Sequence, residues 1–167
     1  MHKMGLTMNW LMRLLGKQKT KSTSSTDLVE VVTENMNTIK ESGSENGNHY
    51  TDNVETINQL KRDEKYDEAI ALLLKSVELT EKESKKANPK PILDEKFAFL
   101  SEGRTNVWGV APWYYEQLAI IYRKQKKYAE EVSILERYEK QPKAPGAGPK
   151  KLAERLIKAR ELLEKHA

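Results

Sequence analysis

The feature that most constrains the fold is a recurrence of apolar residues at three- and four-residue intervals from about residue 54 onward. Such spacing places apolar side chains on one face of an α-helix. Polar stretches, or stretches containing Pro and Gly, interrupt the pattern at residues 61–65, 81–91, 101–112 and 141–150, and stretches of this kind end helices. The sequence therefore predicts an all-α fold of two antiparallel helical hairpins followed by a C-terminal capping helix.

Each predicted helix has an inward face that can be read from its spacing. A proline at residue 112 suits the first turn of the third helix, where its missing N–H breaks no hydrogen bond. The predicted core faces are Val54, Ile57 and Leu60; Tyr66, Ile70, Leu73, Leu74 and Val77; Tyr115, Leu118, Ala119 and Tyr122; Val132, Leu135 and Tyr138; and Leu152, Leu156, Ala159 and Leu163.

The first 49 residues differ in composition from the rest. The net charge of +4 comes from a basic arm, residues 1–26, which carries Lys3, Arg13, Lys17, Lys19 and Lys21 and no acid. The remainder is close to neutral, so the charge argues against nucleic acid as a partner. Residues 27–49 are predicted to be a polar linker, in which 27–40 fits helix or strand, Asp27 is a candidate helix cap, and 41–49 is a loop. The helical domain is predicted to span 50–167.

The arm has amphipathic character. Met4, Met8, Leu11 and Leu15 fall at helical spacing, and lysines follow them. The apolar run is too short to span a bilayer and lacks a secretory cleavage site, which predicts a cytoplasmic protein. Two readings stay open. The arm is either a flexible tail or, through residues 8–19, a weak membrane-surface contact that would make the protein peripheral to a membrane.

The two hairpins also match each other. Residues 57–73 align with the second hairpin when Tyr66 is set against Tyr128, with a basic turn before each tyrosine and acidic residues after it. The second unit resembles a tetratricopeptide repeat. On its first helix, an aromatic residue, a Leu, a small residue and a second aromatic residue stand at the family's positions, and these are Tyr115, Leu118, Ala119 and Tyr122. Tyr128, Leu135 and Pro142 match the positions that follow in the family. The resemblance covers residues 53–142. Glu131 stands where the family has a small residue, and the tyrosines lie further apart than the family period of about 34 residues.

The resemblance implies a right-handed helical superhelix whose first helices line a groove for a peptide partner. The residues that it places on this face are Trp113, Glu116, Ile120, Arg123 and Lys124 in the second unit and Asn58 and Arg62 in the first. An apolar Trp and Ile beside charged residues would suit an amphipathic or extended segment. The alternative is that the inserted segment 87–111, with Phe97, Phe99 and Trp108, covers this face itself.

The sequence offers little for catalysis. It has no cysteine, and His2, His49 and His166 lie near the termini or in the polar linker. Acidic pairs fall in helix turns, and the Gly residues at 146 and 148 lie between prolines rather than in a phosphate-binding loop. We therefore expect no enzyme activity, no cofactor and no metal site.

The expected function is a non-catalytic adaptor that binds a protein or peptide in a helical groove. Two alternatives remain. One is a helical regulatory module of a multidomain or nucleic-acid-associated system, and the other is a peripheral membrane protein that uses residues 8–19.

Overall fold

The computed structural model describes residues 25–88 and 107–166. Contacts divide the chain into two units, 1–34 and 35–167, and the packing described below is that of the second unit. The all-α prediction is confirmed, whereas the predicted boundaries at residues 26 and 49 stay predictions. The elements are α2 (Ser25–Ser42), β1 (Ser44–Glu45), β2 (Asn48–His49), the 3-10 helix η1 (Tyr50–Asp52), α3 (Asn53–Arg62), α4 (Tyr66–Ala87), α5 (Pro112–Lys124), α6 (Tyr128–Glu139) and α7 (Ala147–Lys165).

Residues 25–49 are more regular than predicted. The segment 27–40 is helical, and α2 begins at Ser25, so Asp27 lies inside the first turn instead of capping it. The predicted loop 41–49 contains a small antiparallel hairpin in which Ser44 pairs with His49. Its turn is formed by Asn46 and Gly47, with φ angles of 51° and 82°. An Asn-Gly pair favours a two-residue hairpin turn because both residues tolerate positive φ.

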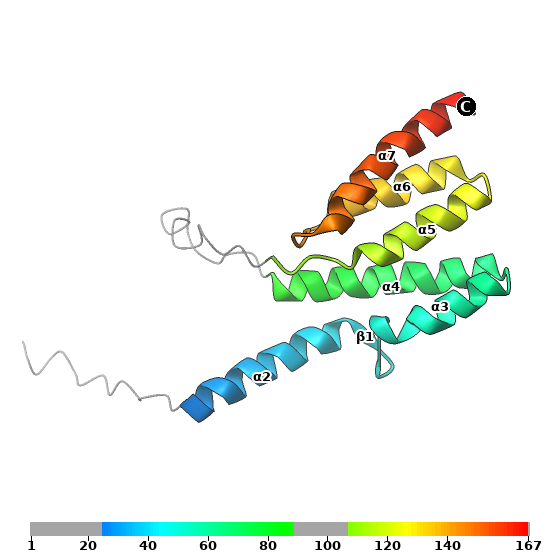
Figure 1. Ribbon diagram of the computed structural model, residues 1–167. Helices are drawn as coiled ribbons and strands as arrows, with labels where there is room; N and C mark the ends of the chain where they lie inside the picture. The colour runs from blue at the N-terminus through cyan, green and yellow to red at the C-terminus, as the bar shows by residue number, and fades with distance from the viewer. Residues whose placement is uncertain (1–24, 89–106, 167) are drawn as a thin grey trace, which may run out of the picture. The chain divides into compact units, whose positions relative to one another are not determined.

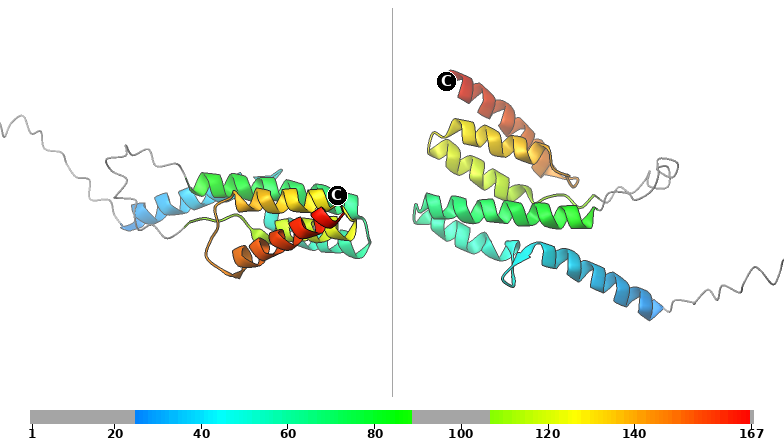
Figure 2. Two further views of the ribbon diagram at one scale, coloured as in Figure 1. Left: turned by 90° about the horizontal axis from the view of Figure 1, so that it is seen from above. Right: turned by 180° about the vertical axis from the view of Figure 1, so that it is seen from behind.

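Helices α3 to α7 pack side by side in sequence order, each antiparallel to the one before it (Figure 1). Seen from above, α4 and α6 lie along one side of this array, whereas α5 and α7 lie along the other (Figure 2). Helix α5 also contacts α7 directly. This arrangement gives α5 an inner face toward α4 and α6 and an outer face away from them.

The two hairpin turns have the same hydrogen-bond pattern when the sequence is aligned with itself so that Tyr66 matches Tyr128. Lys65 N donates to Leu60 O over 2.9 Å, and Lys127 N donates to Tyr122 O over 2.9 Å. The preceding residues, Glu64 and Lys126, have φ angles of 57° and 58°. The two turns therefore have the same backbone conformation.

The predicted core faces are buried. Tyr115, Leu118 and Ala119 are fully buried on α5, and Tyr122 is half-buried. Each of the other predicted faces contributes at least one residue to the same core, with the remaining members packed against it. Most of the inserted segment 87–111, namely residues 89–106, lies outside the described residues.

Helix α4 continues to Ala87, into the polar stretch 81–91 that was predicted to interrupt the helical pattern. Thr80 and Ser84 are buried there and hydrogen-bond to residues 107–111, whereas Glu83 is buried against Tyr50. Ser84 Oγ donates to Trp108 O over 2.6 Å, and Ala111 N donates to Thr80 Oγ1 over 2.9 Å. Side chains of α4 therefore satisfy the backbone of this segment, which would otherwise be left unpaired.

Gly109 fits this close approach. A Cβ added there would lie 2.1 Å from Ala144 N, so a larger residue would push the two segments apart. Val110 N also donates to Pro142 O over 3.1 Å in the same place.

Helix α7 begins at Ala147, earlier than the predicted break at 141–150 implies, because Gly148 and Pro149 both fit within a first helical turn.

Candidate binding surface

The outer face of α5 is centred on Ile120. This side chain is 37% exposed, although Ala119 and Ile121 on either side of it in the sequence are buried. Trp113, two turns earlier on the same face, is half-buried and packs against the core. Its ring meets the ring of Tyr114 edge-to-face at a centroid distance of 5.0 Å. Trp113 and Ile120 thus form an apolar strip along α5, which we call the α5 strip.

Two ion pairs flank the α5 strip. Glu116 accepts a salt bridge from Lys151 of α7 at 2.6 Å. Lys124, at the C-terminal end of α5, lies 3.3 Å from Glu64 and 4.8 Å from the centre of the Tyr66 ring. The hydrogen bonds to Tyr66 and Glu64 raise the pKa of the Lys124 ammonium. These contacts join α5 to α7 on one side and to the α3–α4 turn on the other.

Helix α3 contacts α5 through a lysine side chain. Lys61, which sequence reasoning did not select, donates a hydrogen bond to Gln117 Oε1 of α5. Burial lowers the pKa of the Lys61 ammonium. Arg62 instead pairs with Glu55 on its own helix at 2.7 Å, and Asn58 is half-buried. The half-buried cation next to the α5 strip is therefore Lys61.

Arg123 and Arg155 both bind one buried carboxylate. Arg123 Nε lies 2.8 Å from Glu131 Oε2, and Arg155 Nε lies 3.1 Å from Glu131 Oε1. The Glu131 side chain is 0% exposed. Glu131 was identified in the sequence as a departure from the small residue of the tetratricopeptide repeat. In the structure it joins α5, α6 and α7, so Arg123 belongs to the packing between helices as much as to the surface.

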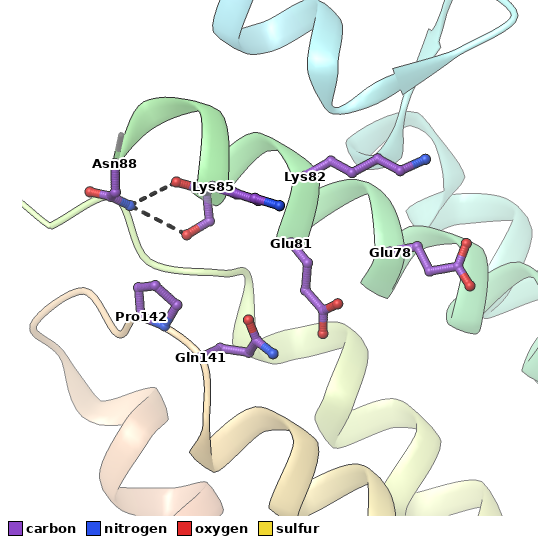
Figure 3. Close-up of a pocket in the computed structure, with 8 residues that line it drawn as sticks. Glu78, Glu81, Lys82, Lys85, Asn88, Gln141 and Pro142 are labelled. Atoms are coloured by element: carbon purple, nitrogen blue, oxygen red, sulfur yellow. Dashed lines mark hydrogen bonds between the residues drawn. The ribbon is translucent and has the colours of Figure 1, made fainter. Parts of the chain in front are cut away.

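A separate cleft of about 660 Å³ lies along the C-terminal half of α4. Figure 3 shows Glu81 pointing from α4 toward Gln141, whereas Lys82 points away from both. The Glu81 carboxylate is held in place, since both of its oxygens accept hydrogen bonds from Arg137 over 2.8 Å and Oε1 also accepts one from Tyr115. None of the seven residues predicted from sequence lines this cleft. Its lining residues are Glu78, Glu81, Lys82, Ser84, Lys85, Asn88, Gln141 and Pro142.

The alternative in which the inserted segment covers the α5 strip concerns residues that are only partly described. Phe97 and Phe99 lie outside the described residues. Trp108 is 38% exposed and is bound at the end of α4, where its backbone N donates to Asn88 Oδ1 over 3.1 Å. The residues of the predicted membrane contact, 8–19, also lie outside the described part.

A cluster around Glu83 was not expected from the sequence. Its buried carboxylate accepts a hydrogen bond from Tyr50 OH over 2.6 Å, and His49 Nε2 lies 3.3 Å away. Burial, with the neighbouring Glu83, raises the pKa of the Tyr50 hydroxyl above its ordinary value of 10.0. Burial likewise raises the pKa of Tyr114 to about 12. The sequence carried one signal for the local structure here, since His49 and Asp52 form the capping box at the start of η1.

Within residues 25–88 and 107–166, no group of His, Cys, Asp and Glu side chains is arranged to hold a metal ion. No helix of this described part has the length and apolar character needed to cross a bilayer. Searches of protein-family models, of curated proteins and of solved structures found no match for the chain.

Proposed function

We propose that this protein is a non-catalytic interaction module that binds a helical or extended segment of another protein along the α5 strip. The observation that carries the proposal is the exposure of Ile120, 37%, in the middle of the helix that contributes most to the core. Large apolar side chains at such a position favour an amphipathic partner that can cover them. Trp113 adds an aromatic anchor, and its edge contact with Tyr114 supports the ring in one orientation.

The charges around the strip favour a partner with acidic as well as apolar residues. Lys61 binds a neutral amide, Gln117, so its charge is not offset by the acceptor of its hydrogen bond. Lys151 is 67% exposed although it pairs with Glu116. A carboxylate on the partner could approach either ammonium from the solvent side. Complementary charge of this kind increases the rate and specificity of association more than it increases affinity.

The test uses two isoleucines of the same chain. Ile120 and Ile157 are both exposed, 37% and 59%, but Ile157 lies on α7 away from the α5 strip. A photo-crosslinking amino acid is placed at position 120 or at position 157, and adducts are compared in extract from cells that contain the protein. We expect a discrete protein adduct from position 120 only. In pull-down of that protein, Ile120→Glu should abolish capture, and Ile157→Glu should leave it unchanged.

The proposal fails if both positions give the same adducts, or if folded Ile120→Glu captures the crosslinked protein as well as the wild type does. Circular dichroism of both variants shows whether the helices are retained. A helical spectrum with unchanged melting temperature rules out unfolding as the cause of lost binding.

A further inference from the structure

Helix α2 carries an exposed apolar stripe of its own. Val32 is 61% exposed, and Met36 is 45% exposed. Ile39, one turn further on, is half-buried. The spacing of four and then three residues places these side chains on one face of the helix. We call Val32, Met36 and Ile39 the α2 stripe.

This spacing is that of a coiled-coil seam. Apolar residues that alternate between three- and four-residue steps keep one face toward a partner helix. Val29 precedes Val32 by three residues, so the sequence continues the alternation toward the N-terminus. An isolated helix of 18 residues has marginal stability in water, so pairing along this seam would stabilise it.

The charges of α2 favour protein over lipid as the partner. Its charged residues are four acids and one lysine, namely Asp27, Glu30, Glu34, Glu41 and Lys40. Helices that lie on membranes usually have a basic polar face, and this acidic one would be repelled by anionic headgroups.

An identical helix is a suitable partner. With Val32, Met36 and Ile39 at the seam, the heptad pattern places Glu30, Glu34 and Glu41 at positions away from it. Two copies can therefore meet along the same surface patch without bringing carboxylates together, as a two-fold interface requires.

We propose that α2 is a self-association element, and that two copies of the chain pair through their α2 stripes. The seam has only two heptads within the described residues, and such a small interface gives weak association. We therefore expect a dimer that forms in the micromolar range. This inference uses a different helix from the α5 strip and does not depend on the proposed function.

The first test is sedimentation equilibrium of the full chain at protein concentrations from about 1 to 200 µM, which bracket this expected affinity. The apparent mass should rise from the monomer value of 19.2 kDa toward twice that value. Met36→Glu should keep the chain monomeric, because it places a charge in the seam. Asn37→Glu is the matched control, since the neighbouring position lies off the stripe, and it should dimerise like the wild type.

A second test uses the absence of cysteine from the chain. Under mild oxidation, Val32→Cys alone should form a crosslinked dimer if the helices are parallel. A mixture of Val32→Cys and Met36→Cys should do so if they are antiparallel. Either result supports pairing, provided that Asn37→Cys crosslinks much less. The proposal is overturned if the wild type stays monomeric throughout, if Met36→Glu and Asn37→Glu behave alike, or if no cysteine variant exceeds the Asn37→Cys background.

Discussion

The turns of the two helical hairpins have the same backbone conformation, but the hairpins differ at one buried position. Ala69 in α4 and Glu131 in α6 follow the turn at the same distance, and both are fully buried. In the first hairpin, Lys61 of α3 donates a hydrogen bond to Gln117 of α5. At the equivalent place in the second hairpin, Arg123 of α5 and Arg155 of α7 both bind Glu131.

The difference shows how one side chain changes the junction between successive helices. Where the buried residue is alanine, one cation meets a neutral amide directly. Where it is glutamate, two cations from neighbouring helices converge on the same carboxylate. The buried charge is stabilised only because both arginines bind it, since an unpaired buried carboxylate is strongly disfavoured. Glu131 therefore determines how α7, the last helix, is attached to the array.

The largest effect should come from making the second hairpin like the first. Glu131→Ala removes the shared carboxylate and leaves Arg123 and Arg155 facing each other in a partly buried site. Breaking a buried ion pair in this way costs about 3 to 5 kcal/mol, and we expect a loss of that size in the free energy of unfolding. Urea denaturation followed by circular dichroism measures it.

Glu136→Ala is the control for this variant. Glu136 also joins α6 to α7, through Arg160 at 2.8 Å, but its side chain is 39% exposed. Exposed ion pairs contribute little because water already solvates both charges. We expect no measurable change in stability. Equal losses in the two variants would contradict the role assigned to the buried carboxylate.

An intermediate effect is expected when the whole charged cluster is replaced. In the combined variant Arg123→Met, Glu131→Leu, Arg155→Leu, no charge is left without a partner. Buried ion pairs can often be exchanged for apolar residues of similar volume with little loss. We expect the unfolding free energy to return to within about 1 to 2 kcal/mol of the wild-type value. If this variant is as unstable as Glu131→Ala, the cluster stabilises the junction by its charges rather than by its volume.

The smallest expected effect is on how the free energy of unfolding depends on pH, and it concerns residues at the first hairpin. Tyr50 of η1 packs beside the first hairpin and donates to the buried Glu83 of α4. Because folding raises the pKa of Tyr50 above 10.0, its stabilisation is present below pH 10 and is lost as the pH rises above it.

The measurement compares the loss of stability between pH 8 and about pH 10.5 in the wild type and in Tyr50→Phe. The wild type should lose about 1 kcal/mol more than the variant, since phenylalanine has no proton to release. Tyr115, whose hydroxyl donates to Glu81, contributes equally to both proteins and cancels in the difference. Identical losses would show that the Tyr50 hydroxyl is not protected by folding.

The sequence by itself determined helices α3 to α7 and their inward faces, whereas it left residues 27–40 of α2 open between helix and strand. Apolar residues at helical spacing, such as Tyr115, Leu118 and Ala119, predict which side of α5 is buried, because only one side of that helix can be covered by apolar contact. The matching tyrosines at 66 and 128 also predicted the two equivalent turns. These features depend on local spacing, which is fully visible in the chain.

Only the tertiary structure decided how the polar residues are used. Ser84 and Thr80 form hydrogen bonds with the backbone of residues 107–111, and Glu131 accepts hydrogen bonds from two arginines. Whether a hydroxyl or carboxylate is solvated or buried depends on partners distant in the sequence, so periodicity carries no information about it. For the same reason the hydrogen bond from Lys61 of α3 to Gln117 of α5 could not be predicted from the spacing of residues.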